Sequence, residues 1–428
     1  MNVTLLTHGT RGDVQPFTAL AVALMERGHS VVLAVPENLV SFVERSGVRT
    51  SKLAIDSQQF LESAEGRAWL ASGNVRAFMD RMNAIMHAHR EELFADQLRA
   101  CEGADVIVSG LLTEDYVSNI AEARDIPMVA LHLAPMRANT SYTNALLTTR
   151  HLPFGWLRRL TGVLVERVWW AGFRADVNEF RRTLGLPATN ETTARRLTKR
   201  GSPSVHAISR HILPPPPEWG ADMPTVGPLR FPASARSRLG EAAPPAGLVA
   251  WLEAGPAPVF LSLGSMPIEN PGQTVGMIAA VVRRLGTRAV IGAGWSRLEA
   301  QGLPDEVRIV GAVDHGWLLP RCRAAVHHGG AGTVSAVVEA GLPAVVCSVF
   351  ADQPFWGGQL ERLGVGVHLP FRQFGEARLE AALRRVLDPQ MKAAAERLGA
   401  LVRAEPDAAG EVVRMVEAAG GAAAARSA

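Results

Sequence analysis

Apolar residues and turn signals follow one another at the start of the chain in the order strand, turn, helix, strand. Residues 3–7 form a short apolar run, and a glycine-containing turn over residues 9–12 follows it. Residues 16–27 carry apolar side chains at helical spacing and end at Gly28, and residues 29–36 form a second strand-like run. This order is a βαβ unit, which predicts a parallel sheet covered by helices.

The same alternation continues through the first half of the chain and then weakens. Strands are expected at residues 105–109 and 127–132, with a helix over residues 115–123 between them. Residues 151–186 depart from the pattern because they are rich in Trp, Phe and Arg. In a βαβ scaffold, an insertion of this kind is expected to lie over the ligand crevice.

The second half of the chain repeats the βα pattern of the first. Strands are predicted at residues 259–263, 288–292 and 324–327, with a helix over residues 274–285. From residue 378 onward the chain is expected to be helical. Two halves of similar size and similar element order indicate one α/β architecture used twice.

The length of 428 residues exceeds the ~250–300 residues at which single cores stop growing, so two domains are expected. Proline-rich stretches that resist helix and sheet separate the halves. The predicted organisation is a first Rossmann-like domain over residues 1–228, a linker over 229–248, a second Rossmann-like domain over 249–380, and C-terminal helices over 381–428 that end in a frayed tail at 420–428.

Composition and charge exclude several classes of protein. The chain is 47% hydrophobic and 20% charged, as soluble globular proteins are, and its net charge of +3 without a Lys/Arg run argues against a nucleic-acid partner. No apolar run reaches the ~20 residues of a membrane-spanning helix, so any membrane contact is expected to be peripheral. Cys101, Cys322 and Cys347 lack metal-ligand spacing, which favours a reducing cytoplasm and neither zinc nor a disulfide framework.

A glycine-rich turn between a strand and a helix lies in residues 327–343, HHGGAGTVSAVVEAGLP. The helix is expected to begin near Thr333, where backbone N–H groups and the helix dipole form a site suited to a diphosphate. Gly329, Gly330 and Gly332 lack the Cβ atoms that would hold a phosphate away. A second interpretation is that these glycines only permit a tight turn.

Two further motifs make the pattern specific: GTRGDVQP at residues 9–16 and ADQPFW at residues 351–356. With residues 327–343, they resemble the family 1 nucleotide-sugar glycosyltransferases of the GT-B fold, most closely the sterol glucosyltransferases and the bacterial glycopeptide and macrolide glycosyltransferases. The resemblance implies two facing Rossmann-like domains with parallel sheets and a cleft between them. The C-terminal half would bind the nucleotide-sugar and the N-terminal half the acceptor.

The resemblance also implies which side chains bind the donor. His328 would contact the diphosphate, Asp352 and Gln353 would hold sugar hydroxyls, and Val313 and His315 would flank the nucleobase. The full set of implied donor-binding residues is Gly12, Gly264, Ser265, Trp295, Val313, His315, His328, Gly330, Gly332, Thr333, Asp352 and Gln353.

Some positions depart from the family pattern or allow another interpretation. Asp314 stands where relatives usually have proline, which leaves the backbone geometry of the nucleobase segment open. Ala336 stands where plant-type members have a ribose-binding Glu, so both UDP and dTDP remain open. Asp352 and Gln353 could instead cap a helix that begins at Pro354.

Asp13 is the catalytic base that the resemblance implies. It follows the first strand, at the sheet edge where α/β proteins bind ligands, and would remove the proton of the acceptor hydroxyl as that oxygen attacks the anomeric carbon. The alternative is that Asp13 only caps the helix that contains Pro16. His8 is either packed or close to the acceptor, and no role is assigned to Glu114 or Asp115.

The expected activity is metal-independent, inverting transfer of a hexose from a UDP- or dTDP-sugar to a hydroxyl of a lipophilic acceptor, with the donor as co-substrate and no cofactor. Domain closure would bring Asp13 to the anomeric carbon. Alternatives are a sugar-nucleotide epimerase of similar fold or a non-catalytic partner of a transferase. A dinucleotide oxidoreductase is disfavoured because no G-x-G-x-x-G follows the first strand. The Trp-rich residues 156–170 would either contact acceptor or membrane, or form helix core.

Overall fold

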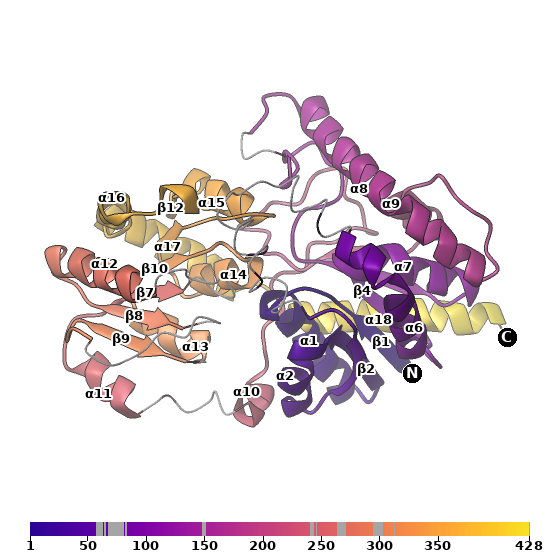
Figure 1. The fold of residues 1–428 in the computed structure, drawn as a ribbon, viewed down its shortest axis with the longest axis horizontal. Coiled ribbons are helices and arrows are strands. Elements are labelled where there is room, and N and C mark those ends of the chain that lie inside the picture. Colours follow the sequence, from indigo (N-terminus) through magenta and orange to yellow (C-terminus); the bar gives the residue numbers. More distant parts are fainter. Residues whose placement is uncertain are drawn as a thin grey trace.

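Two six-stranded parallel sheets, each covered by helices, form the framework of the protein (Figure 1). The α/β class and the two Rossmann-like halves expected from the sequence are thereby confirmed. The computed structural model describes residues 1–56, 63, 66, 81, 84–147, 151–239, 244, 246–262, 271–293, 303–311 and 313–427.

The first sheet has the strand order β3-β2-β1-β4-β5-β6, with every neighbouring pair parallel. The order reverses between β1 and β4, and ligands of open α/β sheets bind beside such a reversal. The strands are β1 (Asn2–Leu6), β2 (Ser30–Pro36), β3 (Arg49–Leu53), β4 (Val106–Gly110), β5 (Met128–His132) and β6 (Ser204–His206).

The second sheet has the order β12-β11-β10-β7-β8-β9, which is the same topology with its reversal between β7 and β10. All of its neighbouring strands are parallel as well. The strands are β7 (Val259–Ser262), β8 (Ala289–Gly292), β9 (Val307–Val310), β10 (Ala324–His327), β11 (Ala344–Val346) and β12 (Gly366–His368).

Helices pack on both sheets and connect their strands. The α-helices of the described residues are α1 (Arg11–Glu26), α2 (Val40–Arg45), α6 (Arg90–Ala100), α7 (Leu111–Ala123), α8 (Gly155–Thr183), α9 (Thr193–Lys199), α10 (Ala233–Arg238), α11 (Ala246–Glu253), α12 (Pro271–Arg284), α13 (His315–Leu318), α14 (Ala331–Glu339), α15 (Gln353–Arg362), α16 (Glu376–Val386), α17 (Pro389–Arg403) and α18 (Ala408–Ser427). Short 3₁₀ turns lie at Glu37–Leu39, Leu319–Arg321 and Phe371–Gln373.

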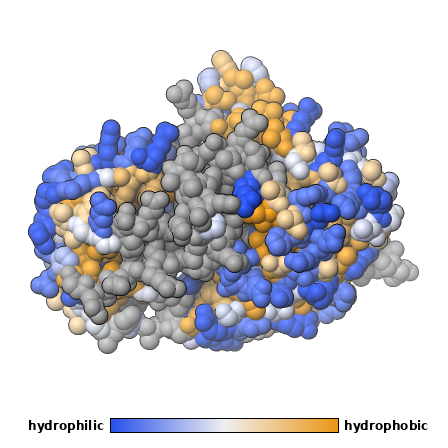
Figure 2. Space-filling model, viewed as in Figure 1, coloured by the Kyte–Doolittle hydropathy of each residue, from blue (hydrophilic) through white to orange (hydrophobic). Residues whose placement is uncertain are grey.

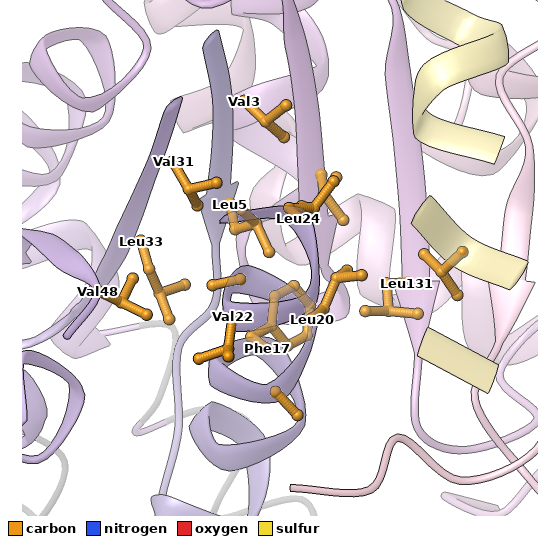
Figure 3. Close-up of a cluster of buried hydrophobic side chains, with 14 of the residues drawn as sticks. Val3, Leu5, Phe17, Leu20, Val22, Leu24, Val31, Leu33, Val48 and Leu131 are labelled. Atoms are coloured by element: carbon orange, nitrogen blue, oxygen red, sulfur yellow. The ribbon is translucent and has the colours of Figure 1, made fainter. Parts of the chain in front are cut away.

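A buried apolar cluster joins the first sheet to α1 and fixes where α1 begins relative to the sheet. Val3 and Leu5 of β1 and Phe17 and Leu20 of α1 are all at most 1% exposed. Figure 3 shows these side chains pointing toward one another between the strands and the helix, with Leu131 of β5 beside α18. Burial of apolar area of this kind is the main favourable contribution to folding.

The C-terminal helix α18 returns to the first sheet, although the chain has already completed the second. It contacts α1, β4 and β5, and Figure 1 shows both chain ends in the same half of the molecule. Residues up to Ser427 are helical, within the stretch 420–428 where a frayed tail was expected. Gly420 packs closely against Met1 and Val106, so no larger side chain fits there without movement of its neighbours.

Two helices begin four or five residues before their predicted starts. Helix α1 begins at Arg11, five residues before the expected start, because Thr10 caps it and Pro16 lies inside it. Helix α7 begins at Leu111 instead of residue 115. The apolar run of β4 continues directly into α7, so no polar cap marks that boundary in the sequence.

Residues from the two halves share one apolar cluster, which joins the halves. The Tyr142 ring meets the Phe355 ring edge-on, with 6.1 Å between centroids. Gln359 Nε2 donates to the Ile212 carbonyl at 2.6 Å. Tyr142 and Ile212 precede the second sheet in the chain, whereas Phe355 and Gln359 belong to α15, so the halves meet through buried contacts.

The Trp-rich residues 156–170 lie in α8, a helix of 29 residues. Trp170 is buried and Trp169 is half-buried, with its indole N–H donating to Asp115 Oδ2 at 2.7 Å, so the helix-core interpretation holds for these two. It is wrong for Trp156, which is 65% exposed. Within the described residues, no helix is long and apolar enough to cross a membrane.

Candidate active site

Asp13 lies in the first turn of α1, where it forms a capping box with Thr10. The Thr10 backbone N–H donates to Asp13 Oδ2 at 2.8 Å, and the Thr10 hydroxyl lies 3.2 Å from the same oxygen. In return, the Gly12 N–H donates to Thr10 Oγ1. Thr10 is thus the N-cap and Asp13 the third helical residue, so the helix-capping interpretation of Asp13 is correct in part.

Gly9 makes room for the Asp13 carboxylate. Its φ of +125° is a conformation that other residues rarely adopt. A Cβ on Gly9 would collide with Asp13 Oδ2 and would lie 2.7 Å from Asp13 Cγ. Any larger residue at position 9 would therefore displace the carboxylate, a dependence that the sequence motif alone does not reveal.

The surroundings of Asp13 make its carboxylate more basic than usual. Burial raises the pKa of Asp13 to about 6, the Thr10 hydrogen bonds oppose this rise, and the negative charge of Asp352 adds to it. Asp13 and Asp352 come from opposite halves of the chain, so the pKa of Asp13 depends on a charge in the second half. His8, two residues after β1, is buried, and burial lowers its pKa to about 4.

Gly329 and Gly330 have different roles in the glycine-rich turn after β10. Gly329 has a φ of +97°, and a Cβ there would lie 2.7 Å from Val346 Cγ1. A Cβ on Gly330 would lie 2.6 Å from His328 Nε2. Gly329 therefore serves the tight turn itself, whereas Gly330 leaves room for the His328 ring beside the helix start.

Both histidines of this turn are neutral at ordinary pH. Burial lowers the pKa of His327 to about 3 and that of His328 to about 4. His327 Nδ1 accepts the Gly329 N–H at 3.1 Å, which assigns this histidine to the turn. His327 Nε2 and His328 Nδ1 are both buried without a partner, so each ring retains one nitrogen with unused hydrogen-bonding capacity.

The N-terminus of α14 lies close to the N-terminus of α1. Gly330 is the N-cap of α14, and no side-chain hydrogen bond caps the helix among the described residues. The N–H groups of its first turn are therefore available to an anion. A Cβ on Gly332 would lie 3.8 Å from the Gly12 carbonyl oxygen, and α1 and α14 contact each other. The predicted residues Gly12, Gly330, Gly332 and Thr333 thus lie together.

Asp352 and Gln353 begin α15, after β11 of the second sheet. Asp352 is the N-cap by position, but its side chain makes no capping hydrogen bond and instead accepts the Trp356 indole N–H at 2.7 Å. Gln353 Oε1 accepts the N–H groups of Val349 and Phe350, at 2.9 and 3.2 Å. The alternative of a simple helix cap is therefore wrong for the Asp352 side chain.

The backbone leading into Asp352 is strained. Ala351 has a φ of +54°, which is uncommon for a residue with a Cβ. Such strain persists only where surrounding contacts enforce it, and it concentrates at functional sites. Burial raises the pKa of Asp352, while the hydrogen bond from Trp356 opposes that rise.

The segment expected at the nucleobase forms a capped helix start. Asp314 is the N-cap of α13 and accepts the Gly316 N–H at 2.8 Å, and it also pairs with Arg236. The His315 ring meets the Phe260 ring edge-on at 5.3 Å, and Val313 packs on the buried cluster that joins the halves. The departure from proline at position 314 is thus accommodated by a side-chain cap.

Three predicted donor-binding residues, Gly264, Ser265 and Trp295, lie outside the described residues. Among the residues that the structure describes, no group of three or more His, Cys, Asp or Glu is arranged to hold a metal ion.

A buried polar cluster at the end of β5 was not assigned a role from the sequence. His132 Nε2 lies 2.8 Å from Glu114 Oε2, and the Arg137 guanidinium donates to Glu114 Oε1 at 2.8 Å. Burial would raise the pKa of Glu114, but Arg137 and His132 outweigh it and lower that pKa to about 2. Burial, with Arg137, lowers the pKa of His132, so a neutral imidazole donates to an ionised Glu114.

Comparison with known proteins assigns the chain to a family. Residues 3–142 match the glycosyltransferase family 28 N-terminal domain, and residues 281–419 match the C-terminal domain of the erythromycin biosynthesis protein CIII-like family. An O-mycaminosyltylonolide 6-deoxyallosyltransferase of Streptomyces fradiae is 34% identical over 95% of this chain and 94% of its own length. The chain is a GT-B glycosyltransferase.

Other relatives of the glycosyltransferase support the same assignment. An uncharacterised glycosyltransferase of Mycobacterium leprae is 34% identical over 91% of this chain and 90% of its own length. A sterol 3-beta-glucosyltransferase of Arabidopsis thaliana is 31% identical over 96% of this chain, which spans 64% of that longer protein. The expected relation to sterol and bacterial natural-product glycosyltransferases is confirmed, and the protein transfers a sugar from a nucleotide-sugar.

Solved structures show that the glycosyltransferase has the GT-B fold. The calicheamicin glycosyltransferase CalG4 superposes with a TM-score of 0.68 at 16% identity, covering 98% of both chains. The glycosyltransferase VinC in complex with dTDP gives a TM-score of 0.66 at 20% identity, covering 98% of this chain and all of its own.

Proposed function

We propose that the enzyme catalyses inverting, metal-independent transfer of a hexose from a UDP- or dTDP-sugar to a hydroxyl group of a lipophilic acceptor. The first half of the chain, residues 1–228, would bind the acceptor. The second half, residues 249–380, would bind the donor. Asp13 would act as the general base.

The single observation that carries this proposal is the position of Asp13 opposite the second half of the chain. Its carboxylate experiences the charge of Asp352, and the adjacent Gly12 carbonyl faces Gly332 at the start of α14. A donor whose diphosphate rests on α14 would therefore present its sugar toward both carboxylates. A base on the side of the sugar away from the diphosphate is what inversion requires.

The start of α14 and His328 would stabilise the diphosphate as it leaves. The free N–H groups of the first turn of α14 and the helix dipole favour negative charge there. His328 is neutral before the donor binds, so it would offer an uncharged N–H or take up a proton as charge develops. Thr333, in the same turn, adds a hydroxyl that can donate.

Asp13 would accept the acceptor proton through Oδ1, because Oδ2 already accepts from Thr10. A pKa near 6 leaves the carboxylate ionised at neutral pH and more basic than an ordinary aspartate. Proton transfer would still be late, since an alcohol holds its proton far more strongly than this carboxylate does. It would accompany bond formation between the acceptor oxygen and the anomeric carbon.

The acceptor class rests on the relatives. Two relatives more than 30% identical are named for a sterol and for a tylonolide, both large apolar molecules that carry hydroxyl groups. The structure of VinC, which has a related fold, contains dTDP. We would therefore test dTDP-sugars as donors as well as UDP-sugars. Ala336 cannot make the carboxylate contact to ribose that plant-type members use, so neither nucleotide is preferred on that ground.

A donor-by-acceptor screen by mass spectrometry tests the proposal. UDP- and dTDP-hexoses would each be incubated with sterols, macrolide aglycones and phenolic aglycones. The expected result is a product heavier by one hexose residue for at least one pair, with inverted anomeric configuration by NMR. Nucleotide release or epimerisation without any acceptor would instead indicate a sugar-nucleotide epimerase and overturn the proposal.

The role of Asp13 is tested by Asp13→Asn beside a matched control. Removal of a general base is expected to lower kcat by about 10²–10⁴-fold. Asp388→Asn is the control, because Asp388 also caps a helix, accepting the Gln390 N–H at 2.8 Å, but lies at the start of α17. Transfer by Asp13→Asn within a few-fold of the control would show that Asp13 is only a capping residue.

A further inference from the structure

Five of the ten large apolar side chains that are exposed among the described residues lie in or just before the first half of α8. The exposed fractions are 59% for Phe154, 65% for Trp156, 54% for Leu160, 48% for Leu164 and 61% for Val168. Single exposed apolar residues are common on protein surfaces, but a contiguous group of this size marks an interaction site.

The spacing of these residues places them along one side of the helix. Trp156, Leu160, Leu164 and Val168 follow one another at intervals of four, which puts each about one turn beyond the last. We call these four residues the α8 stripe. Figure 2 shows apolar surface where this end of α8 projects from the molecule, so the stripe forms a ridge and not a groove.

The stripe is not needed to hold α8 in place. Trp170, Phe173, Val177 and Phe180 on the other side of the helix are at most 6% exposed and pack in the buried cluster beneath α6 and α7. Burial on that side already fixes the helix to the first half of the chain. The exposed apolar ridge therefore lowers the solubility of the protein without stabilising its fold. Such a surface is typical of an interaction site.

Basic side chains lie on the exposed side of α8 within the span of the stripe and beyond it. Arg167 and Arg174 lie seven and fourteen residues after Leu160, so they share its face of the helix. Arg182 lies about two turns beyond Arg174. All three are exposed, and none forms an ion pair with another described residue.

The acidic residues of α8 are engaged elsewhere and do not neutralise these arginines. Glu166 accepts the Ala138 N–H at 3.1 Å, and Asp176 is buried against His87 at 2.8 Å. Glu179 pairs with Arg90 at 3.4 Å. The exposed side of α8 therefore offers an apolar ridge over its first half and exposed arginines from Arg167 to Arg182, on a helix about 40 Å long.

We propose that the exposed side of α8 docks the enzyme on an anionic phospholipid membrane. Trp, Phe and Leu side chains would enter the boundary between headgroups and acyl chains, while Arg167, Arg174 and Arg182 would contact anionic headgroups. A deformable surface fits a projecting ridge, whereas a folded partner would need a matching groove. The proposal concerns attachment of the protein and does not depend on the proposed function.

Two other occupants are less consistent with the observations. An acceptor molecule would be held in a concave site, whereas the stripe is convex. A second copy packed symmetrically on α8 would bring the unpaired arginines of both helices into one interface, and burial of unpaired charge is costly. Both remain distinguishable outcomes of the experiment below.

Vesicle flotation with the full chain tests the proposal. The probes are vesicles of phosphatidylcholine alone and of phosphatidylcholine with phosphatidylglycerol, at about 0.1 M and about 0.5 M NaCl. We expect the wild type to float with the anionic vesicles, and to do so less at the higher salt. The combined variant Trp156→Ser, Leu160→Ser, Leu164→Ser should lower the bound fraction at least about tenfold.

Two further variants separate charge from apolar contact. Arg167→Gln with Arg174→Gln should remove the preference for anionic vesicles while the stripe is intact. Leu401→Ser is the control, because Leu401 is 50% exposed but lies on α17; its flotation should equal that of the wild type. Unchanged melting temperatures would show that each variant is folded.

The contradicting outcomes are equally concrete. The proposal is wrong if the wild type floats with neither vesicle, or if the stripe variant floats as the wild type does. A wild type that is dimeric by light scattering and becomes monomeric in the stripe variant, without vesicle binding, would assign the ridge to a second copy. Loss of sugar transfer to a soluble acceptor without any change in flotation would assign it to the acceptor site.

Discussion

Thr10 donates two hydrogen bonds to the same oxygen of Asp13. The Thr10 backbone nitrogen lies 2.8 Å from Asp13 Oδ2, and Thr10 Oγ1 lies 3.2 Å from it. The two residues form a capping box at the start of α1. The same contacts that begin the helix therefore orient the carboxylate and leave Oδ1 for other partners. Capping and catalysis are compatible roles for Asp13, not competing ones.

Replacement of Thr10 by Val separates these roles. Thr10→Val keeps the backbone N–H but loses the hydroxyl, so α1 should lose about 1 kcal/mol of capping stabilisation. If Thr10 positions the base, kcat should fall about tenfold while the KM for the donor stays constant. Thr10→Ser restores the hydroxyl and should restore kcat. Equal kcat for Val and Ser variants would show that the hydroxyl has no positioning role.

The pH dependence of transfer should report the ionisation of Asp13. Its pKa is raised to about 6, and a base must be deprotonated to act, so kcat/KM should be constant above pH 6 and fall about tenfold per pH unit below it. Asp352→Asn removes a negative charge that contributes to the raised pKa, so the acid limb should move to lower pH. An acid limb that stays in place in this variant would contradict the coupling of the two carboxylates.

The sequence predicted the parallel sheets and the positions of Asp13 and the β10 turn because buried strands and glycine turns leave short, local patterns. It misplaced the start of α1 because Pro16 was taken as the first helical turn, although Thr10 and Asp13 already satisfy the capping pattern. It could not predict that Asp352 accepts from Trp356 or that Gly9 faces Asp13. Those facts depend on side-chain directions that residue type does not fix.

The three-dimensional structure also separates glycines that look equivalent in the sequence. In Gly330→Ala, the new Cβ would displace the His328 ring, so affinity for a nucleoside diphosphate measured by calorimetry should fall at least about tenfold, with folding intact. In Gly329→Ala, the positive φ and the contact with Val346 should instead cost about 1–3 kcal/mol of unfolding free energy. If both variants bind nucleotide as the wild type does, the turn is not the diphosphate site.

The buried cluster around Glu114 should make the stability of the protein sensitive to Arg137. Arg137→Ala leaves Glu114 without its guanidinium partner and should lower the unfolding free energy by about 3–5 kcal/mol, measured by urea denaturation. Arg283→Ala is the matched control, since Arg283 pairs with Glu306 but is 61% exposed, and it should lower the unfolding free energy far less than Arg137→Ala does.

The same cluster gives a dependence on pH whose sign follows from the pKa of Glu114. That pKa is about 2 in the folded protein, below the ~4.3 of an unfolded glutamate. The contribution of Glu114 is therefore fully present above about pH 4.3 and is lost as the pH falls toward 2. Glu114→Gln should flatten the decline of unfolding free energy between pH 5 and pH 3, as measured by urea denaturation at each pH. A variant whose stability declines as steeply as the wild type over that range would show that other carboxylates, not Glu114, govern acid unfolding.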